Sequence, residues 1–242
     1  MTPLSTTYFA TATGLLQRAY EANQPVLRQL GPVMGRSVAA GGVIHTFGSG
    51  HSEIVAREIV GRAGGLAGVS TILDTTGGFI ENLVGYGIKL AERYDRQHGL
   101  RAGETVVVIS NSGKNAAPIE VALYAQQKGL TVVALTSLAM SRTAPTVHPG
   151  GRNLHAIADY ALDNGGVPGD AIVDVADGLR AGPTSTLVGA MLLNLLFLEV
   201  IDWLRANGHP LPILRSQNIP GTVERNRELV QRYAGRLSRP LS

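Results

Sequence analysis

Two short segments rich in glycine and serine carry the residue types that bind an anion. The first spans residues 48–52 and reads Gly-Ser-Gly-His-Ser, and the second spans residues 110–113 and reads Ser-Asn-Ser-Gly. Glycine lets the backbone approach a ligand and turn its N–H groups inward, and serine hydroxyls donate further hydrogen bonds. A helix that starts at the same point adds a partial positive charge. Such segments could hold a phosphate dianion without an arginine.

The pair of segments is more informative than either one alone. A single Gly-Ser-Gly turn is common, and Ser-Asn-Ser-Gly could serve only as a turn and helix N-cap. Here each segment follows a short apolar run, at residues 43–47 and 105–109, and each opens a helical pattern. In a doubly wound sheet of order 2-1-3-4-5 these two strands are neighbours, and ligands bind outside their carboxyl ends. We therefore expect both segments to border one crevice.

Four competing ligand-binding or catalytic motifs are absent from the sequence. A dinucleotide-binding fingerprint needs a third glycine at the position of Glu53, and a P-loop needs a glycine at the position of Val108. Neither a Gly-x-Ser-x-Gly nucleophile elbow nor a His-Glu-x-x-His zinc motif occurs. The scattered His, Asp and Glu residues lack the spacing of metal ligands. The sequence therefore predicts no cofactor and no metal.

Strand and helix patterns alternate along the chain. Apolar runs predict strands at residues 43–47, 69–73, 105–109, 131–135 and 158–162, with a possible short strand at 171–175. Helical patterns occur at residues 4–40, 52–64, 81–98, 117–128, 184–205 and about 221–237. Pro25 marks a break or a new start in the first of these, and residues 136–157 are expected to be a loop.

The alternation of strands and helices indicates the fold class. It predicts a three-layer α/β sandwich around a five-stranded parallel, doubly wound sheet of order 2-1-3-4-5, with helical additions at both ends. No polar linker divides the chain, so residues 1–242 are expected to form one domain with its core at about 35–210.

The composition excludes several classes of protein. Hydrophobic residues make up 44% of the chain and charged residues 16%, which argues against intrinsic disorder. The absence of cysteine excludes disulfides, thiolate metal sites and a cysteine nucleophile. The N-terminal residues lack the pattern of a signal peptide, and the longest apolar stretch, 187–198, is shorter than the ~20 residues of a membrane span. We expect a cytoplasmic protein without a membrane partner.

The basic charge is confined to one end of the chain. The formal net charge is +3, and residues 215–242 hold six arginines against two glutamates. Several of these arginines alternate with glutamates at helical spacing, which is typical of a solvated helix face, with an anion-binding arm as the alternative. Because no basic face spreads over the rest of the chain, we expect no nucleic-acid partner.

Three motifs together resemble the sugar isomerase (SIS) domain family. They are Phe-Gly-Ser-Gly-His-Ser at residues 47–52, Ile-Ser-Asn-Ser-Gly at 109–113, and Gly-Pro-Thr-Ser-Thr at 182–186, which opens a long helix. The resemblance covers roughly residues 35–210 and is greatest to a phosphoheptose-isomerase-like branch. It implies a five-stranded parallel sheet, a phosphosugar pocket, and a dimer or tetramer.

By position, the resemblance implies that three segments contact the sugar phosphate. The implied contacts are Gly48, Ser49, Gly50, Ser52, Ser110, Asn111, Ser112, Gly113 and Asn115, with Thr184, Ser185 and Thr186 closing the site. The glycines mark where the backbone must approach the ligand. Asn115 is a mild departure, because many relatives carry Thr or Ser there.

Aldose–ketose isomerisation needs a base that moves a proton between two carbons and an acid that serves the carbonyl, usually a Glu and a His. Glu58 is similar in position to the base of phosphoheptose isomerases, with a salt bridge to Arg62 as the alternative interpretation. The His that those enzymes carry in their long helix corresponds here to Asn194, which cannot shuttle a proton. His51 is the best substitute, and Glu81 is a further candidate.

The sequence thus predicts a phosphosugar-binding protein, first of all an aldose–ketose isomerase. One alternative is a phosphosugar-binding regulator without catalysis, which the departure at Asn194 suggests. Another is a lyase of the N-acetylmuramate 6-phosphate etherase type, in which Glu81 would act. The helix at 187–198 is apolar almost all round, so we expect it to be buried in the core or at the subunit interface of a homodimer or homotetramer.

Overall fold

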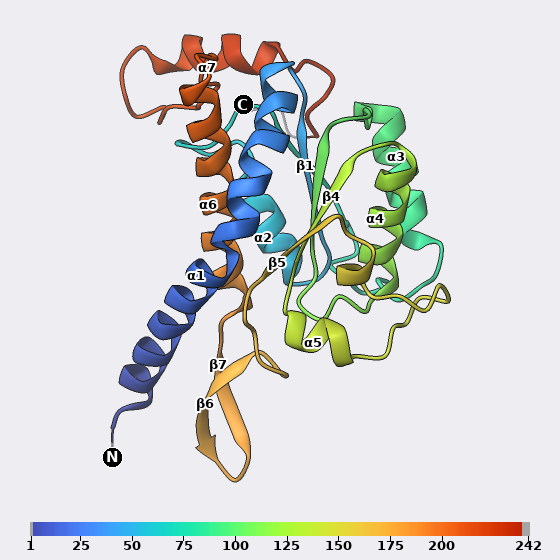
Figure 1. Cartoon of the computed structure of the whole chain (residues 1–242), viewed down its shortest axis with the longest axis vertical. Helices are drawn as coiled ribbons and strands as arrows, with labels where there is room; N and C mark the ends of the chain where they lie inside the picture. Colours follow the sequence, from blue (N-terminus) through green and yellow to red (C-terminus); the bar gives the residue numbers. More distant parts are fainter. Residues whose placement is uncertain (1, 239–242) are drawn as a thin grey trace.

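A computed structural model describes residues 2–238, and its centre is a sheet of five parallel strands (Figure 1). In chain order these are β1 Ile44–Gly48, β2 Val69–Ile72, β3 Thr105–Ile109, β4 Thr131–Thr136 and β5 Tyr160–Asp163. They lie in the order β2-β1-β3-β4-β5, so the predicted sheet order is confirmed. Phe47 of β1 pairs with Val108 of β3, which brings the carboxyl ends of both strands to one edge.

Helices cover both faces of the sheet. Each face needs an apolar partner, since every residue of β1, β2 and β3 is buried. One face carries α1 Leu4–Ala39, α2 Ser52–Glu58 and α6 Ser185–Ala206, and the other carries α3 Tyr86–His98 and α4 Ala116–Gln127 (Figure 1). Val107 enters the core beneath α6, whereas Val106 and Val108 enter the core beneath α4. The three-layer α/β sandwich is therefore confirmed.

α1 is one helix of 36 residues, so the predicted break or new start at Pro25 is wrong. Pro25 is exposed, so the carbonyl group that its ring leaves without an N–H partner can bond to water. The opposite side of α1 packs closely on α6, where a Cβ atom at Gly35 would collide with the ring of Trp203. Packing along α6 outweighs the local cost of the proline.

Other differences from the sequence prediction concern element ends and short elements. α3 starts at Tyr86 and not at residue 81, because Gly85 adopts a φ of 91° and the carboxylate of Glu120 accepts hydrogen bonds from the N–H groups of Gly85 and Gly87. The expected loop at 136–157 contains two short helices, α5 Leu138–Thr143 and η1 Leu154–Ala156. The last helix is shorter than predicted, with α7 covering Thr222–Gln231.

Residues 171–183 form a hairpin rather than one short strand. β6 Ala171–Ala176 pairs antiparallel with β7 Leu179–Pro183, and the hairpin projects from the body beside the first turns of α1 (Figure 1). The Tyr8 hydroxyl of α1 donates a hydrogen bond of 2.9 Å to the carbonyl oxygen of Pro183. α1 therefore braces the base of the hairpin where the chain enters α6.

The C-terminal segment crosses the amino end of the sheet, and its arginines do not all face solvent. Arg225 of α7 donates to the carbonyl oxygen of Ile213, so the predicted solvated face is wrong for this residue. Arg236 donates to both carboxylate oxygens of Glu104 at 2.8 Å, and His45 contacts the same carboxylate at 3.0 Å. Although burial raises the pKa of Glu104, hydrogen bonds from His45, the Val43 N–H group and Arg236 outweigh it and lower the pKa to about 2.

α6 is buried on its core side and open on its outer side. By length and composition it could cross a membrane, a test that the core helix of a soluble protein also passes, and 44% of its apolar window is buried in the chain. Leu187 and Leu198 remain 43% and 55% exposed. The expected burial on several sides is therefore not complete within one chain.

Candidate functional site

A pocket lies at the carboxyl ends of β1 and β3, where the sheet order places a ligand site. Its lining includes residues of both serine-rich segments and of the start of α6. The lining residues are His51, Ser52, Val55, Ile109, Asn111, Asn164, Ser185 and Thr186. All of the polar ones are neutral side chains or a histidine, so the pocket offers hydrogen bonds rather than a fixed cation.

The segment after β3 leaves several donors free. Within residues 2–238, the backbone N–H groups of Asn111, Ser112, Lys114 and Asn115 make no hydrogen bond, nor does the hydroxyl of Ser112. Gly113 adopts a φ of 64°, and its N–H group donates to the Ser110 hydroxyl at 3.2 Å. Unpaired N–H groups that precede a helix form an anion-binding concavity.

Gly113 packs closely against Ser141 of α5. A Cβ atom at this position would collide with the hydroxyl of Ser141, which lies 2.8 Å from Nδ1 of His155. Burial lowers the pKa of His155, which favours the neutral ring beside that hydroxyl. The left-handed backbone and the close packing both require glycine here.

The segment after β1 is held by a carboxylate that the sequence analysis did not single out. The Ser49 hydroxyl donates to Asp74 at 2.8 Å, and Asp74 follows β2, the neighbouring strand. The Asp74 carboxylate also accepts bonds from the N–H groups of Thr76 and Gly78 and from the hydroxyls of Thr76 and Tyr86. Burial raises the pKa of Asp74, but the hydrogen bonds from Thr76, Tyr86 and Ser49 outweigh it and lower the pKa. Ser49 is therefore engaged inside the protein and does not offer its proton to the pocket.

Two glycines of this segment have packing roles. A Cβ atom at Gly48 would collide with the backbone of Ser52, and Gly50 adopts a φ of 57°. The backbone of Gly78 packs against Gly50, where an added Cβ would lie 2.7 Å from the Gly50 nitrogen. The segment after β2 thus lies directly on the first serine-rich segment.

A second unforeseen carboxylate sits at the start of α6. Asp170 accepts hydrogen bonds from the N–H groups of Thr184 and Ser185 at 3.1 and 2.9 Å. It also accepts from their hydroxyls, at 3.3 and 2.5 Å. Thr184 is buried and Ser185 half-buried, whereas Thr186 is exposed at the pocket. Two of the three residues predicted to close the site therefore already hold an internal anion.

Comparison with known proteins decides the family. The SIS domain model matches residues 7–137, which is more than half of the chain. The chain belongs to the SIS domain family. A UPF0309 protein of Halalkalibacterium halodurans is 34% identical over 244 residues and covers 96% of this chain and 95% of its own length.

Solved structures of low sequence identity share the SIS fold. A phosphoheptose isomerase of Francisella tularensis has a TM-score of 0.53 at 15% identity, covering 80% of this chain and 96% of its own. The NanR protein of Vibrio vulnificus, solved in complex with ManNAc-6P, has a TM-score of 0.52 at 17% identity, covering 97% of this chain and 68% of its own. At these identities the likeness concerns the fold alone.

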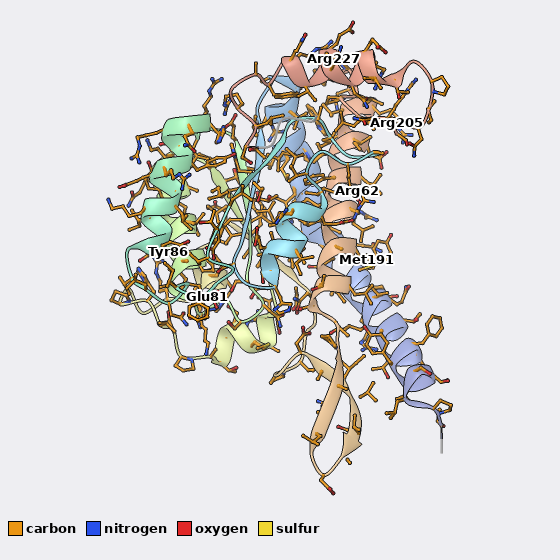
Figure 2. The ribbon with its side chains drawn as sticks, turned by 180° about the vertical axis from the view of Figure 1, so that it is seen from behind. Arg62, Glu81, Tyr86, Met191, Arg205 and Arg227 are labelled. Atoms are coloured by element: carbon orange, nitrogen blue, oxygen red, sulfur yellow. The ribbon has the colours of Figure 1, made fainter. Side chains whose placement is uncertain are left out.

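In this SIS domain, Glu58 lies away from the pocket. It pairs with Arg62 at the end of α2 and is 40% exposed, which is the alternative that the sequence left open. Figure 2 shows Arg62 beside α6, on the opposite side of the molecule from Glu81 and Tyr86. Asn194 is exposed on α6 and donates to the carbonyl oxygen of Ala190 in its own helix. Neither residue faces the pocket of this chain.

His51 lies at the SIS pocket, and Glu81 lies beside the segment that follows β3. His51 lines it directly and is exposed. Glu81 accepts a hydrogen bond of 2.6 Å from the Asn115 side chain, and its carbonyl oxygen accepts from the N–H group of Ala117 at the start of α4. Asn115 is therefore directed toward Glu81. Across residues 2–238, no group of three or more His, Asp or Glu side chains is arranged to hold a metal ion.

Proposed function

We propose that this SIS domain binds a sugar phosphate in the pocket between β1, β3 and α6. The observation that carries the proposal is the set of unpaired N–H groups at Asn111, Ser112, Lys114 and Asn115, joined by the free hydroxyl of Ser112. These donors suit a phosphate group, since they precede the 12-residue helix α4 and need no desolvated cation. The phosphoheptose isomerase of Francisella tularensis and the Vibrio vulnificus NanR protein in complex with ManNAc-6P support this ligand class.

The reaction we propose is aldose–ketose isomerisation. The step moves a proton between two adjacent carbons while the carbonyl oxygen gains or loses a proton. His51 lines the pocket and is the residue best placed to transfer protons to and from the sugar. Glu81, fixed by Asn115 beside the anion-binding segment, is the second acid–base group. Glu58 could act only on the pocket of a second subunit.

The test of isomerisation is turnover of a panel of aldose and ketose phosphates, followed by NMR. We expect one pair of sugars to interconvert, and the rate to fall at least 100-fold in His51→Ala, the size typical of acid–base catalysis. Glu81→Gln should also lower the rate. Glu92→Gln is its matched control and should leave the rate unchanged, because Glu92 pairs with Lys89 on the surface of α3. Absence of turnover with every sugar, while binding persists, would contradict the isomerase proposal.

A non-catalytic phosphosugar sensor is the second candidate. It is favoured by the outward side chain of Asn194 and by the ion pair that occupies Glu58. Calorimetry with the same sugar panel separates the two proposals, because a sensor binds a sugar phosphate tightly without converting it. The lyase alternative is tested by release of lactate from N-acetylmuramate 6-phosphate, which Glu81→Gln would abolish.

We propose that the outer face of α6 packs against a second copy of the chain. Leu187 and Leu198 are exposed on this face, and Ile54 of the adjacent α2 is 56% exposed. Apolar side chains that gather on one exposed surface are typical of subunit interfaces. Sedimentation velocity tests the proposal, and a strict monomer at micromolar concentration would contradict it.

A further inference from the structure

Two helices, α4 and α6, start near the pocket, and their N-termini differ in one respect. The donors before α4 are free, at Asn111, Ser112, Lys114 and Asn115. At the start of α6, the N–H and hydroxyl groups of Thr184 and Ser185 are bonded to the carboxylate of Asp170. The segment before α4 therefore has free donors for an anion, whereas the donors of Thr184 and Ser185 already bind the carboxylate of Asp170.

The position of Asp170 is fixed both by the hairpin register and by its hydrogen bonds. The hairpin register pairs Ala171 with Pro183, so Asp170 stands opposite Thr184 at the base of the hairpin. Asp170 adopts a φ of 54°, in the left-handed region that costs a non-glycine residue free energy. The surrounding bonds hold it there, since its carboxylate has four donors and the Tyr8 hydroxyl bonds to Pro183. These contacts hold the Asp170 carboxylate at the N-terminus of α6.

We propose that Asp170 is a specificity-determining residue that excludes a second anionic group from the α6 end of the pocket. This inference rests on the proposed function. A ligand phosphate then binds at the segment after β3, and the distal end of the sugar faces Ser185 and Thr186. Like charges close together in a site with low solvent content repel each other. The preferred substrate class is a sugar monophosphate with an uncharged distal end, rather than a bisphosphate or a phosphorylated sugar acid.

The same reasoning weighs on the choice among the candidate reactions. N-acetylmuramate 6-phosphate carries a carboxylate on its lactyl group in addition to the phosphate. With the phosphate held before α4, that carboxylate would approach Asp170 or would have to stay outside the pocket. The exclusion therefore disfavours the lyase and agrees with the isomerase or the sensor.

The experiment compares the wild-type chain with Asp170→Asn and Asp177→Asn. Asp177 is a matched control, because it is also an aspartate at positive φ, 48°, but lies at the exposed tip of the hairpin. Inorganic phosphate is titrated into each protein while the backbone amides are followed by NMR. We expect shifts at residues 111–115 in all three proteins, and shifts at Thr184 and Ser185 in Asp170→Asn alone.

A second measurement tests the substrate class. The affinity for fructose 1,6-bisphosphate relative to fructose 6-phosphate is expected to rise roughly tenfold in Asp170→Asn, about 1.4 kcal/mol, and to stay unchanged in Asp177→Asn. Wild-type shifts at Thr184 and Ser185 would overturn the inference, and they can be read even if Asp170→Asn does not fold. An unchanged affinity ratio in a folded Asp170→Asn would also overturn it. Phosphate binding by none of the proteins would overturn the proposed function together with this inference.

Discussion

Replacing Asp74 with asparagine perturbs the anchor of the two segments after β1 and β2. The carboxylate accepts five hydrogen bonds, including one backbone N–H group on each oxygen, from Thr76 at 2.9 Å and Gly78 at 3.1 Å. An asparagine keeps only one acceptor oxygen. In either orientation its NH₂ group therefore faces a backbone N–H group that cannot rotate away. The hydroxyls of Ser49 and Tyr86 could reverse their roles, but they would bond to a neutral group.

The expected loss follows from these contacts. A hydrogen bond to a charged group contributes about 1.5–3 kcal/mol, and leaving one buried donor unpaired costs about 1–3 kcal/mol. With one backbone bond lost and the remaining bonds weakened, we expect Asp74→Asn to lower the free energy of unfolding by about 3 kcal/mol at pH 7. Asp202→Asn makes the same chemical change in an exposed ion pair with Arg205, where the expected loss is at most about 0.5 kcal/mol.

Urea denaturation, followed by circular dichroism, measures the free energy of unfolding of both variants. Its dependence on pH provides an internal check. The pKa of Asp74 is lowered in the folded protein, so its contribution is complete above the unfolded pKa and is lost as the pH falls through the folded pKa. The difference between wild type and Asp74→Asn should therefore narrow below about pH 4. A difference under about 1 kcal/mol at pH 7 would refute the reasoning, because it is less than one charged hydrogen bond. So would a difference that stays constant as the pH falls.

Three further predictions concern other parts of the molecule. Glu104→Gln leaves Arg236 buried without its carboxylate partner, so the free energy of unfolding from urea denaturation at pH 7 should fall by about 3–5 kcal/mol. Because the pKa of Glu104 is lowered to about 2 in the folded protein, the stability of the wild type should fall as the pH drops from about 4.5 to 2. Gly113→Ala should abolish phosphate binding in calorimetry, whereas Gly103→Ala, also at positive φ but in open space, should keep it. Leu198→Glu should shift the sedimentation profile to the monomer without unfolding the chain, and an unchanged profile would place the interface elsewhere.

Local patterns were sufficient to predict the sheet and the two serine-rich segments. The strand at 105–109 is β-branched and fully buried, and the glycines at positions 50 and 113 both have the left-handed backbone that glycine permits. Strand order followed from the alternation of strands and helices, because right-handed crossovers leave few topologies. These features depend on residues close together in the sequence or on general rules of chain connection.

The two carboxylates that organise the site depend on contacts between distant residues. Asp74 could have been found, since the predicted order places the end of β2 beside the end of β1, where Ser49 lies. Asp170 could not, because its position opposite Thr184 depends on a hairpin whose second strand, Leu179–Pro183, is mostly exposed and lacks an apolar pattern. The predicted break at Pro25 was wrong for a related reason, since the packing of α1 on α6 outweighs the local effect of the proline.

The pair between Glu104 and Arg236 joins residues 132 positions apart, and this separation has a consequence for synthesis. At a translation rate of about 5–20 residues per second, the arginine is made about 7–26 seconds after the glutamate. During that interval the Glu104 carboxylate lacks its cation, and burying it without Arg236 would be costly. A chain released before residue 236 keeps that defect permanently. Arg236 thus ties the C-terminal segment to the amino end of the sheet, and a chain that stops before Arg236 should be less stable than one that includes it.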